Sequence, residues 1–231
     1  MKKKCIAVIP ARGGSKRIHQ KNIKVFFGKP LIAYSIENAL NSNLFDKVIV
    51  STDDEEIAKI ALEYGAEVPF IRPKKLGDDL IGIAPVIQHA VDYLLHTLGI
   101  DIDYVCTIYA TAPLLEEKYL KQGYEEIKKN TAKKAFSVTS MPSPIQRAFK
   151  ITSEGRCEMF TPDFFYSRSQ DLDDAYHDAG QFSWNNLKIE SDKIPYGEDS
   201  IPIIIPRHLA QDIDTLEDWK RVELMYYALY K

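Results

Sequence analysis

The first loop of the chain concentrates residues that suit anion binding. Arginine, two glycines, serine and lysine occupy positions 12–16, directly after the apolar run 5–10. Glycine tolerates the positive φ values with which successive backbone N–H groups converge on an anion. Arg12 and Lys16 add full charges, and arginine can hold a phosphate with two parallel hydrogen bonds. The residues of this predicted anion loop are Arg12, Gly13, Gly14, Ser15 and Lys16.

The charge around this loop is unevenly distributed. The 231-residue chain has a net charge of -3, yet no aspartate or glutamate precedes Glu37. This local basic excess indicates an anion site and argues against a general nucleic-acid surface. A solvated basic turn is the alternative. The loop matches neither GxxxxGK[ST] nor GxGxxG, so the common ATPase and dinucleotide fingerprints do not apply.

Two aspartates near the end of the chain have a spacing that suits a metal ion. Asp212 and Asp214 flank Ile213. In an extended segment both carboxylates lie on one face while the residue between them points into the core. Mg²⁺ takes one or two carboxylates and completes its shell with phosphate oxygens and water. The alternative is capping of the last helix by Asp214 or Thr215, with Asp218 completing a capping box, which leaves Asp212 unexplained.

These residues need a scaffold, and the chain alternates short apolar runs with helical patterns. This rhythm predicts a three-layer α/β/α domain with a mainly parallel sheet and helices on both faces. The loop at 12–16 then lies at the carboxyl edge of the sheet, where open α/β folds bind ligands. Strands are expected at 5–10, 47–51, 104–109, 135–140 and 200–205, with a strand-like piece at 67–71. Helices are expected from Pro30 and over 55–64, 84–99, 116–130 and 215–230.

The rhythm breaks between residues 141 and 184. We expect a hairpin and loops inserted there into a single domain that spans 1–231. The segment is rich in aromatic residues, and an exposed apolar hairpin of this kind commonly covers a partner surface.

The remaining composition excludes several classes of protein. Cys5, Cys106 and Cys157 are scattered without CxxC spacing, which supports neither a zinc site nor a disulfide framework. The first apolar run is too short for a signal peptide, and no other stretch could span a bilayer. We therefore expect a cytoplasmic protein without a membrane or nucleic-acid partner.

Five blocks in order resemble the CMP-sialic acid synthetases, the acylneuraminate cytidylyltransferases. They read IPARGGSKRIHQKNIKVFFGKPLIAYSI, VIVSTDDEEIAKIALEYGAEVPFIRP, YATAPLL, YHDAGQF and QDIDTLEDW, and together they span nearly the whole chain. The third and fourth blocks look most like the pseudaminic acid branch of the family. The resemblance implies that a nonulosonic acid attacks the α-phosphorus of CTP, with Mg²⁺ present, to give a CMP-sugar and pyrophosphate. It also implies a nucleotidyltransferase fold and a homodimer whose inserted segment, 141–184, reaches the neighbouring active site.

The resemblance assigns nucleotide and metal roles to individual residues. Residues 12–16 would cradle the triphosphate, with Lys21 as a further cation. Asn22 matches a contact to the base or ribose, although a turn role explains it nearly as well. Arg72 matches another nucleotide contact. Arg12, Lys16, Lys21 and Asp212 would carry catalysis, and Asp212 with Asp214 would hold the metal.

The sugar would contact a later segment. Arg168, Gln170, Tyr176 and His177 lie in a stretch that resembles the sugar-binding segment of the family. The fork of Arg168 matches a carboxylate, while a surface ion pair accounts for it equally well. A single histidine is more often structural or exposed than catalytic.

One block departs from the sialic acid form of the family. This chain reads YATAPLL where many relatives read QPTSPLR, so Tyr109 replaces a glutamine and Leu115 an arginine. An aromatic and apolar pocket suits a deoxy, methyl-bearing sugar, with Tyr109 as a sugar contact. N-acetylneuraminate, legionaminate and 3-deoxy-octulosonate remain alternative sugars. A glycosyltransferase and a non-catalytic nucleotide sensor remain alternative classes.

Overall fold

The computed structural model describes residues 4–78, 81–130, 132–190 and 197–231. Its strands are β1 (Cys5–Pro10), β2 (Val25–Phe26), β3 (Lys29–Pro30), β4 (Lys47–Ser51), β5 (Tyr104–Ile108), β6 (Lys134–Ser140), β7 (Phe149–Ile151), β8 (Cys157–Met159), β9 (Tyr176–Asn186) and β10 (Ser200–Ile204). Its α-helices are α1 (Leu31–Asn41), α2 (Glu55–Glu63), α3 (Ile83–Asp92), α4 (Glu117–Asn130) and α5 (Leu216–Tyr230). A π-helical turn, Tyr93–Thr97, continues α3.

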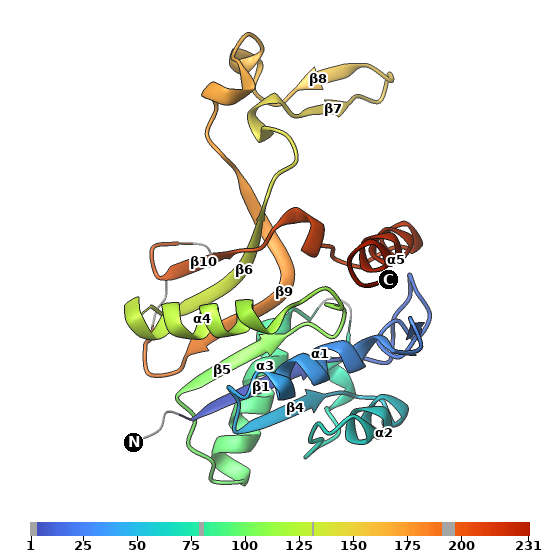
Figure 1. The fold of residues 1–231 in the computed structure, drawn as a ribbon, viewed down its shortest axis with the longest axis vertical. Coiled ribbons are helices and arrows are strands. Elements are labelled where there is room, and N and C mark those ends of the chain that lie inside the picture. Colours follow the sequence, from blue (N-terminus) through green and yellow to red (C-terminus); the bar gives the residue numbers. More distant parts are fainter. Residues whose placement is uncertain (1–3, 79–80, 131, 191–196) are drawn as a thin grey trace.

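Six strands form one mixed sheet in the order β10-β6-β9-β5-β1-β4 (Figure 1). Strand β1 runs parallel to β4 and β5, and β10 runs parallel to β6. Strand β9 is antiparallel to both of its neighbours, β5 and β6. The expected mainly parallel sheet is confirmed, with one reversed strand near its centre.

Helices cover both faces of this sheet, as the alternating pattern predicts. On one face, Ile57 of α2 and Leu120 of α4 share a core with Trp184 of β9. On the other face, Ile87 of α3 packs with Val105 of β5. This three-layer arrangement agrees with the expected fold class, and it leaves the carboxyl ends of β1, β4 and β5 at one edge.

Most expected elements are confirmed closely because their apolar periodicity reflects burial in this core. Strands β1 and β4 have the bounds that we expected. Asp54 caps α2 by accepting from the N–H groups of Glu56 and Ile57. The piece at 67–71 forms only a single bridge, between Glu67 and Ile49. No helix in the described ranges is long and apolar enough to cross a membrane.

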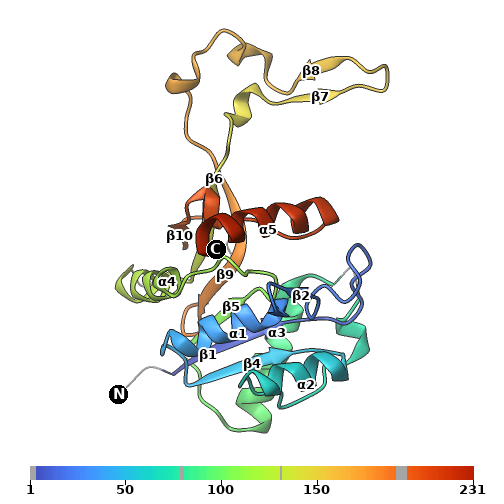
Figure 2. The same cartoon turned by 45° about the vertical axis from the view of Figure 1, so that its right-hand side comes forward.

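The inserted segment is shorter than the expected 141–184. Residues 176–184 belong to β9, which pairs with β5 and β6 in the main sheet. The segment that leaves the sheet is therefore 141–175, which we call the arm. It carries the small β7–β8 hairpin and stands away from the sheet in both views (Figures 1 and 2).

The expected buried strand at 200–205 is an edge strand. Among the described residues β10 pairs only with β6, so one of its edges has no strand neighbour in that part of the chain. Ile203 is buried, whereas Pro202 and Ile204 are exposed. The apolar run indicated burial on both faces, but the structure covers only one.

Candidate active site

A cavity of 280 Å³ at the carboxyl edge of the sheet gathers the predicted nucleotide residues. Three segments contribute to it: the loop after β1, the segment between α2 and α3 and the end of β5. Hydrophobic side chains from the start of α3 form the remaining wall. The predicted site residues that line this nucleotide cavity are Arg12, Ser15, Lys21, Asn22, Arg72 and Tyr109.

The glycines of the anion loop act differently from our expectation. Neither Gly13 nor Gly14 has a positive φ. The Gly13 N–H donates to the Asp53 carboxylate at 3.1 Å, and the Ser15 N–H donates to the Gly13 carbonyl at 2.9 Å. A Cβ at Gly13 would lie 2.4 Å from an oxygen of Asp54. Gly13 therefore permits close packing against the start of α2, and the anion-binding groups of the cavity are mainly side chains.

Arg72 is held rigidly beneath the nucleotide cavity. Its side chain is 3% exposed, and its guanidinium donates to the Ser51 carbonyl at 3.2 Å. It also pairs with Asp53 at 3.5 Å, the carboxylate that receives the Gly13 N–H. Burial lowers the pKa of Arg72, and the charge of Asp53 acts in the opposite direction. The Arg72 Nε has no hydrogen-bond partner among the described residues, so a donor remains at the cavity wall.

Asn22 supports the anion loop from below. It is buried, and its side-chain amide donates to the carbonyl of Arg12 at 3.0 Å. Its own carbonyl accepts from the N–H of Ile32 at the start of α1. Asn22 therefore combines a structural role with a place in the cavity lining.

Lys21 connects the nucleotide cavity to the aspartate pair. Its ammonium donates to the Ile213 carbonyl and lies 3.4 Å from a carboxylate oxygen of Asp214. Arg17 pairs with the same oxygen of Asp214 at 2.8 Å. Two cations thus neutralise Asp214, while only Lys21 also lines the nucleotide cavity.

The aspartate pair has the predicted geometry. Ile213 is fully buried, and Asp212 and Asp214 both line one cavity of 400 Å³, here called the carboxylate cavity. Thr215, not Asp214, caps α5, and Asp218 completes the capping box. Capping therefore does not account for either aspartate of the pair.

The environment of Asp212 disfavours its charged form. Partial removal of water by the cavity walls raises the pKa of Asp212, although its side chain remains exposed. The nearby charge of Asp214 raises the pKa further, while Lys21 lowers it. No group of three or more metal-binding side chains occurs in the described parts of the chain. Protein ligands for a metal ion are thus limited here to about two carboxylates, a number that Mg²⁺ accepts.

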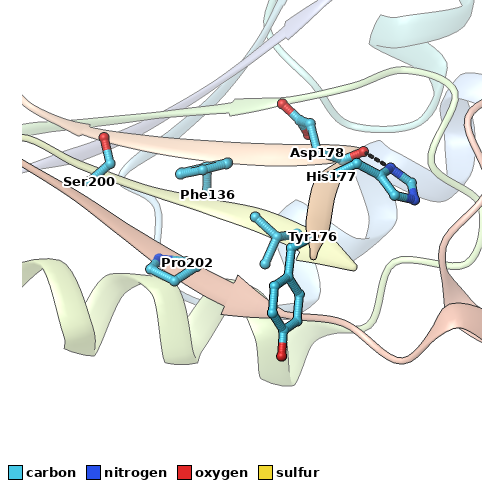
Figure 3. Close-up of a pocket in the computed structure, with 7 residues that line it drawn as sticks. Phe136, Tyr176, His177, Asp178, Ser200 and Pro202 are labelled. Carbon is cyan, nitrogen blue, oxygen red and sulfur yellow. Dashed lines mark hydrogen bonds between the residues drawn. The ribbon is translucent and has the colours of Figure 1, made fainter. Parts of the chain in front are cut away.

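The predicted sugar residues are not gathered in one place. Tyr176 lines a cavity of 470 Å³ with Phe136 and Pro202 on the sheet (Figure 3). His177 borders this cavity and also the carboxylate cavity. Its Nδ1 lies 2.8 Å from the carbonyl oxygen of Asp178, drawn as a dashed line in Figure 3.

Arg168 and Gln170 lie on the arm. Arg168 forms a two-bond ion pair with Asp171, at 2.7 and 3.0 Å, which is the alternative that we kept open for it. Neither residue lines the nucleotide or carboxylate cavity. Leu115 is buried in the core, so its replacement of an arginine does not shape a pocket.

A further cavity contains residues that sequence reasoning missed. This groove cavity of 450 Å³ lies between α3 and strands β5, β6 and β9 and meets the nucleotide cavity at Ile83 and Tyr109. Lys134 and Asp178 are charged members of its lining, and Arg207 and Arg221 line the carboxylate cavity. No local motif marks these residues, because the folding of distant segments brings them to the site.

The fold and the site define a class of protein. A family model described as cytidylyltransferase matches residues 6–199. The fold is similar to that of CMP:2-keto-3-deoxy-manno-octonic acid synthetase complexed with CTP, with a TM-score of 0.69 and 16% identity, over 98% of this chain and 100% of that chain. The chain belongs to the cytidylyltransferase family and is a CTP-using nucleotidyltransferase.

Two curated relatives are similar to this chain over nearly its whole length. The chain is 49% identical to pseudaminic acid cytidylyltransferase of Campylobacter jejuni subsp. jejuni serotype O:2, over 96% of both chains. It is 32% identical to CMP-N,N'-diacetyllegionaminic acid synthase of Legionella pneumophila, over 94% of both chains.

Proposed function

We propose that this protein transfers CMP from CTP to pseudaminic acid and releases pyrophosphate. The observation that carries the proposal is the 49% identity to a pseudaminic acid cytidylyltransferase over nearly the whole of both chains. The cavities support it, because a cation-lined nucleotide cavity adjoins a groove of suitable size for a small sugar.

The cations of the nucleotide cavity account for triphosphate binding. Arg12 and Lys21, from the loop after β1, converge there with Arg72, from the segment between α2 and α3. The guanidinium of Arg12 can bind a phosphate through two hydrogen bonds, and the ammonium of Lys21 contributes a point charge beside Asp214. As pyrophosphate leaves, these fixed charges stabilise the negative charge that develops on it.

Asp212 and Asp214 fit a magnesium ion. Both line the same cavity, and burial together with the charge of Asp214 raises the cost of ionising Asp212, a cost that a divalent cation offsets. When bound, Mg²⁺ would polarise the α-phosphate and neutralise phosphate charge. Lys21 and Arg17, which pair with Asp214, orient its carboxylate in the absence of the ion.

The groove cavity supports a deoxy, methyl-bearing sugar. Ile83, Ile87, Val91 and Leu187 give it an apolar wall, and Tyr109 stands at its junction with the nucleotide cavity. Apolar contacts favour methyl groups over a polyhydroxy chain, although each methyl group changes selectivity only modestly. The lysines of the lining suit an acidic sugar.

The activity is tested by pyrophosphate release with CTP, Mg²⁺ and three acids in parallel: pseudaminic, legionaminic and N-acetylneuraminic. We expect turnover confined to pseudaminic acid. Turnover of another acid would overturn the choice of sugar. If the protein bound CTP but converted none of the three acids, the result would favour the nucleotide-sensor alternative over the proposed activity.

We further propose a homodimer in which the arm of one subunit serves the site of the other. Phe160, Phe165 and Tyr166 of the arm are exposed by 55% to 91%, a large apolar surface for a segment that stands away from the sheet. Arg168 and Gln170 lie on the same arm, outside the cavities of their own chain. The sugar contacts that the sequence predicts for these two residues would then be made in trans.

The arm proposal is tested by light scattering and by complementation. Arg168→Ala and Asp212→Asn subunits are co-expressed with different tags, and mixed dimers are purified. If the arm acts in trans, mixed dimers regain one competent site, with Asp212 from one chain and Arg168 from the other. A monomeric protein, or mixed dimers no more active than the single variants, would contradict the proposal.

A further inference from the structure

Asp178 stands where three cavities meet. It lines the carboxylate cavity with Asp212 and Asp214, the groove cavity under α3 and the apolar cavity of Figure 3. The groove cavity in turn meets the nucleotide cavity at Tyr109. Asp178 is common to the linings of the groove and carboxylate cavities, so a molecule that extends from one into the other lies beside it.

The backbone fixes Asp178 at this junction. Its Oδ1 accepts the N–H of Gly180 at 2.8 Å, and Gly180 adopts a positive φ of 63°. The register between β6 and β9 shifts between Phe136 and Val138, beside the pairing of Val138 with Asp178. Irregularities of this kind re-aim side chains and are common next to active sites. A Cβ at Gly180 would lie 3.4 Å from Cγ of Asp212, so β9 approaches that aspartate closely.

Asp178 differs in the sign of its charge from the other charged side chains that line the groove cavity. Lys133, Lys134 and Asp178 are the charged side chains given by the described residues to this lining. The ammonium of Lys133 donates to the backbone carbonyls of Asn186 and Ile189, and that of Lys134 lies 5.0 Å from the centre of the Phe136 ring. Asp178 thus supplies a carboxylate, which only accepts hydrogen bonds, in a groove that otherwise has positive charge.

A polar group with no assigned partner lies in the same groove. The Ser183 hydroxyl is buried and has no hydrogen-bond partner among the described residues. It lies on β9 with Asp178 and faces the groove with Thr107. Buried polar groups are normally hydrogen-bonded, so this hydroxyl is suited to a ligand with polar substituents.

We propose that Asp178 is a sugar-contacting, specificity-determining residue, whose carboxylate accepts hydrogen bonds from hydroxyl or amide N–H groups of the acidic sugar in the groove cavity. The inference rests on the proposed function. Lys133 and Lys134 attract the negative charge of the sugar to the groove. The Asp178 carboxylate accepts a hydrogen bond from a donor group at one position of that sugar. Because a carboxylate only accepts hydrogen bonds, an analogue that places an acceptor at this position is disfavoured by repulsion.

The test separates contact with the sugar from support of the backbone. Asp178→Asn keeps an oxygen that can accept the Gly180 N–H, but it removes the charge and replaces the second oxygen with a donor. Asp178→Ala removes both functions. Asp101→Asn, on an exposed aspartate paired with Lys188 at 3.7 Å, is the charge-matched control. The measurements are the KM of the sugar and of CTP by pyrophosphate release, CTP affinity by calorimetry, and Tm.

For Asp178→Asn we expect a sugar KM raised about ten-fold or more, with CTP affinity and Tm unchanged. Asp178→Ala should show the same effect on the sugar together with a lower Tm, and Asp101→Asn should change neither. A wild-type sugar KM in Asp178→Asn, or an equal loss of CTP affinity, would overturn this inference alone. Absence of wild-type turnover with all three acids would overturn the proposed function, and this inference with it.

Discussion

Lys21 lies 3.4 Å from Asp214 across a separation of 193 residues. The lysine belongs to the loop after the first strand, and the aspartate precedes the last helix. Lys21 also lines the nucleotide cavity, whereas Asp214 lines the carboxylate cavity. This ion pair therefore joins the two halves of the site, and each half influences the charge balance of the other.

Lys21→Met should remove that connection. We expect kcat/KM for CTP to fall by about 10- to 100-fold, the range for loss of a hydrogen bond that involves a charged group. Pyrophosphate release at varied CTP is the measurement. Lys24→Met is the control, because Lys24 is exposed and lies over the Trp219 ring outside both cavities. Equal activity of the two variants would show that Lys21 does not assist the reaction.

Gly13→Ala and Gly14→Ala should differ sharply. A Cβ at Gly13 meets Asp54, which caps α2, whereas a Cβ at Gly14 meets no atom within 4 Å. Displacing the cap should cost about 1–2 kcal/mol of unfolding free energy, and Gly14→Ala should be neutral or slightly stabilising. Chemical denaturation of both variants provides the comparison, and similar stabilities would contradict the packing role of Gly13.

Arg72→Met should destabilise the fold as well as weaken CTP binding. It leaves Asp53 and the Ser51 carbonyl without a guanidinium at a site that is almost fully buried. Losses of this kind cost about 3 kcal/mol or more. Arg17→Met removes an exposed ion pair to Asp214 and should cost less than about 1 kcal/mol. If urea denaturation gives equal losses for the two variants, burial of Arg72 does not matter for stability.

Asp212→Asn should gain stability while it loses turnover. The raised pKa of Asp212 means that folding disfavours its ionised form, so the charge destabilises the native state above that pKa. Because the side chain is exposed, the gain at neutral pH should be a few tenths of a kcal/mol, about 1 °C in Tm. As the pH falls through the pKa of the folded state, the wild-type carboxylate gains its proton and the difference should disappear. Thermal melts from neutral to acidic pH measure it, and a lower Tm for the variant at neutral pH would contradict the prediction.

The elements that the sequence predicts correctly are those whose local pattern of apolar residues matches their burial in the fold. The apolar runs at β1 and β4 are buried strands, and Ile213 is buried between two cavity-facing aspartates. In each case the periodicity of side chains along the chain directly reflects which side meets the core. The aspartate pair was recognised for the same reason, whereas the anion loop was recognised from its glycines and its local positive charge.

The remainder depends on contacts between distant segments. Strand β9 was missed and assigned to the inserted segment because polar residues and Gly180 interrupt its start, although it lies near the centre of the sheet. Asp53 binds Gly13 and Arg72 across 40 and 19 residues, a role that no local pattern reveals. Asp178 was missed because only strand pairing and the folding of the chain place it beside Asp212.

The arm leaves and re-enters the sheet at two directly paired residues, Ser140 and Tyr176. Such partners in an antiparallel pair have Cα atoms about 4.5–5.5 Å apart, a gap that a short turn can close. The length and sequence of the arm can therefore vary without changing the register of β6 and β9. Exchange of this module between relatives would change the sugar contacts proposed for Arg168 and Gln170 and leave the strands that hold the nucleotide cavity in place.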